Sequence, residues 1–317
     1  MLGATGTIGR ATAVALVRHG HDVVCAVRAR AGLDTLAALL PGTTLRLADV
    51  CDPASLAQDV FAAERFDAVV SCLASRTGAP ADAWAIDHQA HVHALAAAQQ
   101  AGVQHWVQLS ALCVQKPLLA FQHAKLAFEQ ALVGSGLRHS IVRPTAFFKS
   151  LSGQVARVQQ GRPYLVFGDG RLTACKPISD ADLADYLAGC LDEPARWNRV
   201  LPIGGPGPAL TPREQGEQLF ALLGQPPRFK QVPVGLLDTI IGVLGVAGRL
   251  VPPLRAKAEL ARIGRYYATE SMLVLDPATG RYSAEATPSF GSDTLLDYQA
   301  RLLRGEATLE RGEHAVF

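Results

Sequence analysis

The first nine residues have the types and spacing of a phosphate-binding loop. Gly3, Gly6 and Gly9 form a GxxGxxG pattern that leads directly into a helical pattern. The first glycine permits a tight turn, the second lets a pyrophosphate approach the backbone, and the third lets helix pack on sheet. Free N–H groups and the positive dipole end of the helix then favour phosphate. The loop predicts dinucleotide binding, although glycine-rich turns also occur for structural reasons alone.

The next strand ends in basic residues, which bear on the choice of dinucleotide. An apolar run at residues 22–27 leads to Arg28 and Arg30. An acid at this place binds the ribose 2′-hydroxyl of NAD, whereas arginine suits a 2′-phosphate. We therefore expect NADPH; the alternative is a pair of solvated surface arginines. Asp49, after the following strand, either accepts from the adenine amino group or caps the helix that begins near Pro53.

Elements that could position such a loop recur along the chain. Apolar runs at residues 43–48, 66–73, 105–110 and 140–144 alternate with helical patterns. This alternation predicts an α/β fold, a Rossmann-type doubly wound parallel sheet with helices on both faces, over residues 1–146. Residues 147–317 are expected to form a smaller C-terminal substrate lobe, with segments near 183–205 returning to the first domain. Only Met1 and Leu2 precede Gly3, so we expect an incomplete first strand.

Bulk composition excludes several classes of protein. The chain has 317 residues, 49% of them hydrophobic and 18% charged, and a formal net charge of +2, which gives no reason to expect nucleic acid. Six scattered cysteines lack metal-ligand spacing, which favours reduced thiols, no metal site and a cytoplasmic location. The most apolar stretch, residues 232–254, is interrupted by charges and prolines. Its uncharged core, residues 239–248, is too short to span a membrane.

A second group of chemically capable residues lies in the middle of the chain. Ser110 ends the fifth expected strand, and Lys125 follows on the next helix within Phe121-Gln122-His123-Ala124-Lys125. Together with the glycine loop, this arrangement resembles the short-chain dehydrogenase/reductase superfamily. That superfamily places a tyrosine four residues before the lysine, where this chain has Phe121. A phenyl ring has no acidic proton to donate to a carbonyl oxygen, which disfavours carbonyl reduction. Reduction of a conjugated C=C bond stays feasible.

A finer resemblance extends over nearly the whole chain. Residues 71–91, 109–129, 140–154, 167–183, 261–277 and the terminal 314–317 are similar to the divinyl chlorophyllide 8-vinyl reductases, atypical NmrA-like members of that superfamily. The resemblance implies NADPH-dependent reduction of the 8-vinyl group of a divinyl chlorophyllide or protochlorophyllide to ethyl, in chlorophyll or bacteriochlorophyll synthesis. Its substrate would be a flat Mg-tetrapyrrole bearing a carboxylate.

The resemblance and the residue pattern together give a set of expected site residues. Those expected at the reacting centre are Lys125, Ser110, Phe121 and Cys113, although Cys113 also suits simple packing. Those expected at the cofactor are Gly3, Thr5, Gly6, Thr7, Ile8, Gly9, Arg28, Asp49, Val50, Cys72, Leu73, Ala74, Lys125, Pro144 and Phe147. Those expected at the substrate are Phe121, Phe148, Lys149, Lys176, Arg265 and Tyr266, with Arg143 as a further cation.

The expected reaction adds hydride from NADPH to the terminal vinyl carbon and a proton to the carbon nearer the ring. Lys125 is expected to bind the nicotinamide ribose first. The proton donor stays open among Lys125, water, His123, Tyr266 and Tyr267. His88, His91 and His93 share one helix, and an axial ligand to the substrate Mg is one interpretation of that cluster.

Two further alternatives remain open. The apolar helix at residues 236–250 either rests on a photosynthetic membrane or the pigment edge, or belongs to the core. The second functional hypothesis is a non-catalytic NmrA-like NADP(H)-binding sensor or assembly factor for a membrane complex.

Overall fold

The computed structural model describes residues 1–28, 32–62, 64–248 and 251–308. Arg30 and the terminal residues 314–317 lie outside the described residues. The chain divides into two compact units. Unit 1 comprises residues 1–75, 80–144 and 180–202, and unit 2 comprises residues 76–79, 145–179 and 203–317. Residues 180–202 thus belong to the same unit as the glycine loop, and the first boundary follows Pro144.

Unit 1 is built on a sheet of short, mostly buried strands. They are β1 (Val24–Val27), β2 (Thr44–Leu47), β3 (Ala68–Ser71), β4 (His105–Leu109), β5 (Arg138–Pro144) and β7 (Arg199–Ile203), whose last residue falls in unit 2. β1 pairs with β2, β3 with β4 and β4 with β5, all parallel, and β7 lies beside β5. This topology confirms the predicted Rossmann-type α/β fold.

Leu2 occupies the place of the first strand. It forms parallel bridges to Ala26 of β1 and to Ser71 of β3. Its N–H donates to the Val70 carbonyl and its own carbonyl accepts from the Cys72 N–H. Leu2 therefore joins the two halves of the sheet at its centre, and its side chain is 2% exposed.

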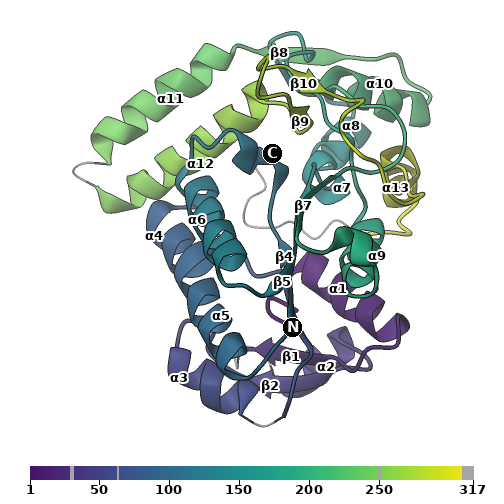
Figure 1. The fold of residues 1–317 in the computed structure, drawn as a ribbon. Helices are drawn as coiled ribbons and strands as arrows, with labels where there is room; N and C mark the ends of the chain where they lie inside the picture. The colour runs from purple at the N-terminus through teal and green to yellow at the C-terminus, as the bar shows by residue number, and fades with distance from the viewer. Residues whose placement is uncertain (29–31, 63, 249–250, 309–317) are drawn as a thin grey trace. The chain divides into compact units, whose positions relative to one another are not determined.

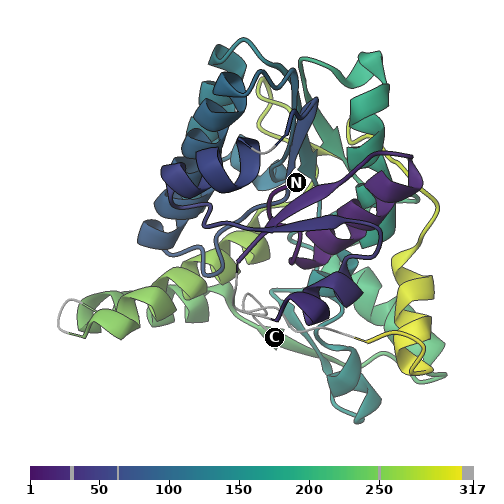
Figure 2. The ribbon, with the colours of Figure 1, turned by 90° about the horizontal axis from the view of Figure 1, so that it is seen from below.

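Helices cover both faces of this sheet, as Figures 1 and 2 show. α5 (His91–Gln100) and α6 (Ala120–Gly134) lie on one face, and α1 (Thr7–Arg18) packs on α9 (Asp180–Asp192) on the other. The core between the first helix pair and the sheet includes Trp106 and Phe128. The remaining helices of the unit are α2 (Leu33–Leu39), α3 (Pro53–Ser55), η1 (Leu56–Phe61), α4 (Pro80–Ala83), η2 (Trp84–Ala90), η3 (Leu112–Gln115) and η4 (Pro194–Arg196).

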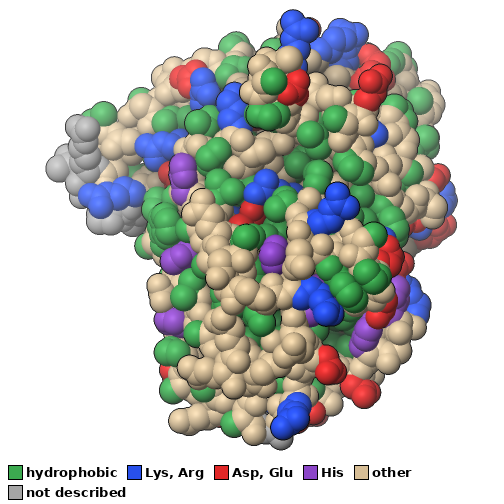
Figure 3. All heavy atoms as spheres, in the orientation of Figure 1, with side chains coloured by type: hydrophobic (Ala, Val, Ile, Leu, Met, Phe, Trp, Pro, Cys, Tyr) green, Lys and Arg blue, Asp and Glu red, His purple; other side chains and the backbone are tan. Residues whose placement is uncertain are grey.

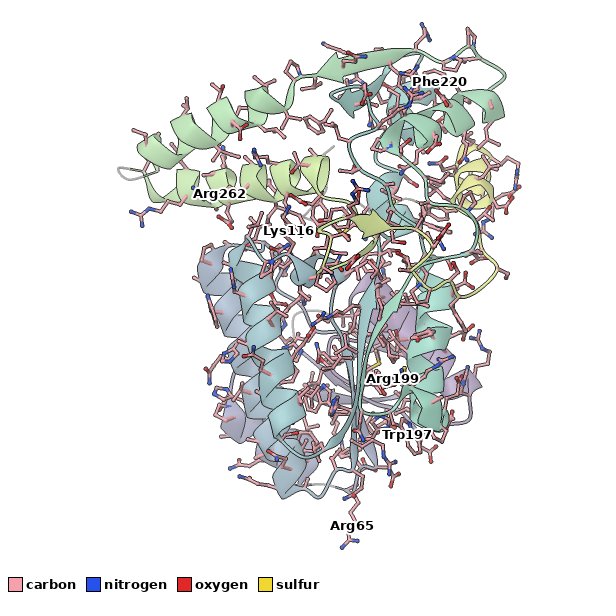
Figure 4. All side chains as sticks on the ribbon, turned by 45° about the horizontal axis from the view of Figure 1, so that its top comes forward. Arg65, Lys116, Trp197, Arg199, Phe220 and Arg262 are labelled. Atoms are coloured by element: carbon pink, nitrogen blue, oxygen red, sulfur yellow. The ribbon has the colours of Figure 1, made fainter. Side chains whose placement is uncertain are left out.

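Unit 2 combines short strands with helices around its own core. Strands β6 (Tyr164–Phe167) and β8 (Phe229–Val232) pair in parallel, and β9 (Val274–Leu275) pairs antiparallel with β10 (Tyr282–Ser283). Its helices are α7 (Phe148–Leu151), α8 (Val155–Gln159), α10 (Pro212–Leu222), α11 (Val234–Ala247), α12 (Pro252–Thr269) and α13 (Leu295–Leu303). Phe220, labelled in Figure 4, belongs to the core cluster that α8, α10 and β6 share.

Candidate cofactor and active site

The glycine loop has the close packing that its spacing predicts. Gly3 has a φ of +73°, and a Cβ there would lie 2.5 Å from the backbone nitrogen of Leu73. A Cβ at Gly9 would collide with the carbonyl oxygen of Gly3. At Gly6 the nearest atom to a Cβ would be 3.6 Å away. Gly3 and Gly9 are therefore required by the loop itself, while Gly6 leaves its outer side open.

The open side of the loop is the N-terminus of α1. Gly6 is the residue before the helix, no side chain caps the helix there, and Thr5 and Gly6 are exposed. The first N–H groups of a helix have no partner within the helix, so an anion can bind them. Thr7 is half-buried and the Ile8 side chain is buried, which limits Ile8 to backbone contact with a dinucleotide.

The other expected cofactor residues follow neighbouring strands. Arg28 is exposed directly after β1, and Asp49 is exposed after β2. Asp49 accepts from the Cys51 N–H at 2.9 Å. The residue that caps α3 is Asp52, so Asp49 does not cap that helix. The remaining members show a range of exposure: Val50 is buried, Cys72 and Leu73 are half-buried, Ala74 is exposed, Pro144 is buried and Phe147 is half-buried. Burial raises the pKa of the Cys72 thiol to about 12, so this group is neutral.

Lys125 is held by a buried carboxylate. Its Nζ lies 2.9 Å from Oδ1 of Asp87, with the side chains 11% and 0% exposed. Oδ1 also accepts from the Ser75 N–H at 3.3 Å. Asp87 Oδ2 is buried and has no hydrogen-bond partner within the described part of the chain. The pair therefore carries an unused acceptor beside an ammonium, which fits a ribose hydroxyl.

The backbone around Asp87 departs from α-helical geometry. Residues Trp84–Ala90 form a π-helix, η2, that packs on α6, the helix carrying Lys125. Such wide turns are uncommon and often occur at functional sites. The Nδ1 of His91 donates to the Ile86 carbonyl at 2.9 Å, which helps to hold the turn.

Ser110 has a different environment from the one expected of a reacting group. Its hydroxyl donates to Oε1 of Glu129 at 2.5 Å, and Ser110 is 5% exposed. Glu129 in turn forms a bidentate ion pair with Arg143. This corrects the expectation that Arg143 is a free cation for the substrate. It also directs the Ser110 proton into the protein interior.

The remaining expected residues of the reacting centre are placed by α6 and η3. Phe121 is half-buried and lies one helical turn before Lys125, so the two side chains share a face. Gln122 fixes the start of α6 by accepting from the Leu118 and Leu119 N–H groups at 2.7 and 2.9 Å. Cys113 is 1% exposed, which favours the alternative that its thiol only packs in the interior.

Apart from Phe121, the expected substrate residues all lie in unit 2. Phe148 is 2% exposed and packs on Tyr298, and Tyr266 is 3% exposed. These two rings are enclosed in the structure, and their contact with a ligand stays a prediction. Lys176 donates to the Thr287 carbonyl at 3.0 Å, Arg265 pairs with Asp238, and Lys149 is half-buried in α7.

The three histidines of residues 88–93 have separate environments. His91 is fully enclosed: its Nε2 lies 2.9 Å from the Ser71 hydroxyl and its ring packs on Phe128. His88 packs edge-on to Trp84, and His93 pairs with Gln89. The three histidines therefore have different partners and do not form one site. No group of three or more His, Cys, Asp or Glu arranged to hold a metal occurs within the described residues.

Sequence reasoning missed Asp87 and Glu129 as members of this site, and it considered His91 only as a ligand to the substrate Mg. A usable indication was present, because Asp87 and His91 interrupt a helix rich in alanine and other apolar residues. A charge on such a helix needs a partner when it is buried. Lys125, which was already expected at the site, could have been assigned as the partner of Asp87.

Comparisons with known proteins identify the fold and the family. Residues 3–194 match the family model described as NAD(P)H-binding. The chain is 51% identical to the divinyl chlorophyllide a 8-vinyl-reductase of Zea mays over 99% of its length and 82% of that protein. It is 26% identical to the photosystem II assembly factor Ycf39 of a Synechocystis strain over 75% of its length and 71% of that protein.

A solved structure shows the same fold at low identity. An NADPH complex of the quinone oxidoreductase QOR2 from Escherichia coli has a TM-score of 0.68 and 19% identity, covering 95% of this chain and 98% of that one. The extent and identity of the match to the maize enzyme decide the family. The chain belongs to the divinyl chlorophyllide a 8-vinyl-reductase family, within the larger group of NAD(P)H-binding Rossmann proteins.

Proposed function

We propose that this protein uses NADPH to reduce the 8-vinyl group of a divinyl chlorophyllide or protochlorophyllide to an ethyl group, in chlorophyll or bacteriochlorophyll synthesis. The observation that carries the proposal is the 51% identity to a reductase of that name over nearly the whole chain. The glycine loop supports the cofactor, and Phe121 beside Lys125 supports a C=C substrate over a carbonyl.

Bound NADPH supplies the hydride for this reaction. The N–H groups at the start of α1 would hold the pyrophosphate, and Arg28 would pair with the 2′-phosphate. Lys125 and the unused Oδ2 of Asp87 would hold the hydroxyls of the nicotinamide ribose, the ammonium as donor and the carboxylate as acceptor. Phe121 offers an apolar surface to the flat macrocycle.

The reaction also needs one proton delivered to carbon. Lys125 is ion-paired and Tyr266 is 3% exposed, so neither is well placed to give it. His123 is exposed on α6, but it is two residues from both Phe121 and Lys125 and so lies on the other side of that helix. Tyr267 is 42% exposed on α12. Of the protein groups considered, Tyr267 is the donor to test first, with water as the remaining source.

The substrate is flat and largely apolar, and such molecules partition to lipid surfaces. Peripheral contact with a photosynthetic membrane is therefore part of the proposal. No helix within the described residues has both the length and the apolar character needed to cross a bilayer.

The direct experiment combines purified protein, NADPH and divinyl chlorophyllide, and follows the Soret band. We expect the band to move to shorter wavelength as the vinyl group leaves conjugation, with one NADPH consumed per pigment. The double variant Asp87→Asn with Lys125→Met serves as the matched control, because it leaves no unpaired charge in the interior. It should lose the shift while keeping its fold by circular dichroism.

An unchanged pigment in the presence of bound NADPH would overturn the proposal. It would favour a second candidate, a dinucleotide-binding protein without turnover. The observations behind that candidate are the missing phenol at Phe121 and the partial similarity to an assembly factor.

A further inference from the structure

Helix α11 is apolar on every side and yet contains no buried residue. Its only charged residue is Asp238. A helix that is hydrophobic all round is ordinarily enclosed by protein or lipid. α11 packs on α12, which covers one side, and an ion pair between Asp238 and Arg265 joins the two helices. The other side needs a different cover.

The uncovered side forms a continuous stripe of large aliphatic side chains. Leu236, Ile240, Val243 and Val246 are spaced by four, three and three residues, which places them on one helical face. Their exposed fractions are 50%, 37%, 63% and 64%. We call these four residues the outer stripe. Monomeric proteins rarely expose a contiguous apolar surface of this kind unless it is an interaction site.

The segment that carries the outer stripe also has an excess of cations. Residues 234–269 contain five cations and two acids, a net charge of +3. The cations are Arg249, Arg255, Lys257, Arg262 and Arg265. Lys257 and Arg262 are exposed on α12, Arg262 while ion-paired with Glu259, and Figure 3 shows Lys and Arg side chains at the surface where α11 and α12 lie in Figure 1. Lys257 is therefore the exposed cation of α12 on which the electrostatic part of the test rests. Arg262 is labelled in Figure 4.

We propose that the outer stripe of α11 docks on the surface of an anionic lipid bilayer. An apolar face buries itself at the boundary between headgroups and acyl chains, while nearby cations attract anionic headgroups. α11 has 14 residues. At 1.5 Å per residue, a helix of that length is only about 20 Å long, so it lies along the surface and does not span it.

This inference deepens the membrane contact included in the proposed function, but it does not depend on catalysis. Vesicle binding is measured without pigment or NADPH. A failure of docking therefore leaves the reductase assay unaffected, and a failure of that assay leaves docking unaffected.

The experiment floats the full-length protein with vesicles of phosphatidylcholine alone or mixed with phosphatidylglycerol. The test variant is Val243→Gln with Val246→Gln, which removes two exposed side chains and keeps good helix propensity. The matched control is Val133→Gln, since Val133 is 52% exposed on the helix α6. Lys257→Gln tests the electrostatic part.

We expect the wild type and Val133→Gln to float with the anionic vesicles. The double variant should lose binding by about tenfold, because apolar burial drives insertion. Lys257→Gln should lose less and only on anionic vesicles. Two results would overturn the proposal: a wild type that ignores anionic vesicles, or a double variant that binds as well as the control. A wild-type dimer that the double variant converts to monomers would overturn it too, by assigning the stripe to a second copy.

Discussion

At the scale of single residues, the pairing of Lys125 with Asp87 determines what the candidate site can do. Asp87 is fully buried, and one of its oxygens serves both Lys125 and the Ser75 N–H. Removing one member of such a pair leaves an uncompensated charge in the interior. The pair therefore stabilises the fold and holds the ammonium in place at the same time.

We predict that Asp87→Asn lowers the free energy of unfolding by about 3 kcal/mol, because the Lys125 ammonium loses its counter-ion. The same variant should bind NADPH more weakly, since Lys125 loses its anchor. Urea unfolding and cofactor titration measure the two effects. In the double variant with Lys125→Met, stability should recover in part while NADPH binding does not. If Asp87→Asn matches the wild type in both measurements, the pair has neither role.

Arg28 permits a second prediction about cofactor choice. It follows β1, at the carboxyl edge of the sheet, where dinucleotides bind in this fold. We predict that Arg28→Ala weakens NADPH binding by about tenfold or more and leaves NADH binding nearly unchanged, because only NADPH has the 2′-phosphate. Fluorescence titration with both nucleotides measures this.

Arg65 provides the matched control for that experiment. It is an exposed arginine that precedes β3, so it lies at the opposite edge of the sheet, as Figure 4 shows. Arg65→Ala should bind both nucleotides like the wild type. Equal losses for NADPH and NADH in Arg28→Ala would argue against a contact with the 2′-phosphate.

At the scale of elements, different glycines of the loop serve folding and cofactor binding. A Cβ at Gly9 meets the Gly3 carbonyl, whereas a Cβ at Gly6 has its nearest neighbour at 3.6 Å. We predict that Gly9→Ala unfolds at a clearly lower temperature. Gly6→Ala should keep its melting temperature and lose NADPH binding, because its methyl group occupies the pyrophosphate side of the loop. Thermal unfolding with and without NADPH distinguishes the two, and similar behaviour of both variants would contradict the assignment.

Elements determined by local patterns were predictable from the sequence. The parallel strands follow from continuous apolar runs. The start of α10 follows from the Thr-x-x-Glu spacing of Thr211 and Glu214, whose side chains form a capping box. The glycine loop was equally local. These features depend on residues within a few positions of each other, so the sequence alone contains the necessary information.

Interactions between distant elements were not predictable in the same way. Ser110 stood in the expected place, but its partner Glu129 lies 19 residues away on α6. The π-helical turn at Asp87 left no mark in the sequence periodicity. The expected substrate residues also belong mostly to a second unit, where Phe148 and Tyr266 contribute to packing. The type of a residue indicates its polarity and size, but it does not indicate which of these side chains the fold buries.

At the scale of the whole molecule, buried histidines couple stability to pH. His91 and His105 are 0% and 4% exposed. Burial lowers the pKa of each to about 4, with Lys125 adding to the effect at His91 and Arg138 at His105. The hydrogen bond from His91 Nδ1 to the Ile86 carbonyl leaves Nε2 as an acceptor facing Ser71, which is the neutral form of the ring.

This arrangement predicts that stability falls in acid. Between pH 6.5 and about 4 the unfolded chain binds protons on these histidines while the folded chain does not, so the free energy of unfolding decreases as the pH drops through that window. For His91 the full loss of stability is on the order of 3 kcal/mol.

Urea unfolding followed by tryptophan fluorescence from pH 7 to 4.5 measures the slope of stability against pH. His91→Gln should start less stable at pH 7 but show a shallower slope, because one of the two groups is gone. His123→Gln, at an exposed position on α6, should keep the wild-type slope. Other groups that titrate in this range are common to all three proteins, so the difference between slopes isolates His91, and an unchanged slope in His91→Gln would show that its ring already accepts a proton in the folded state.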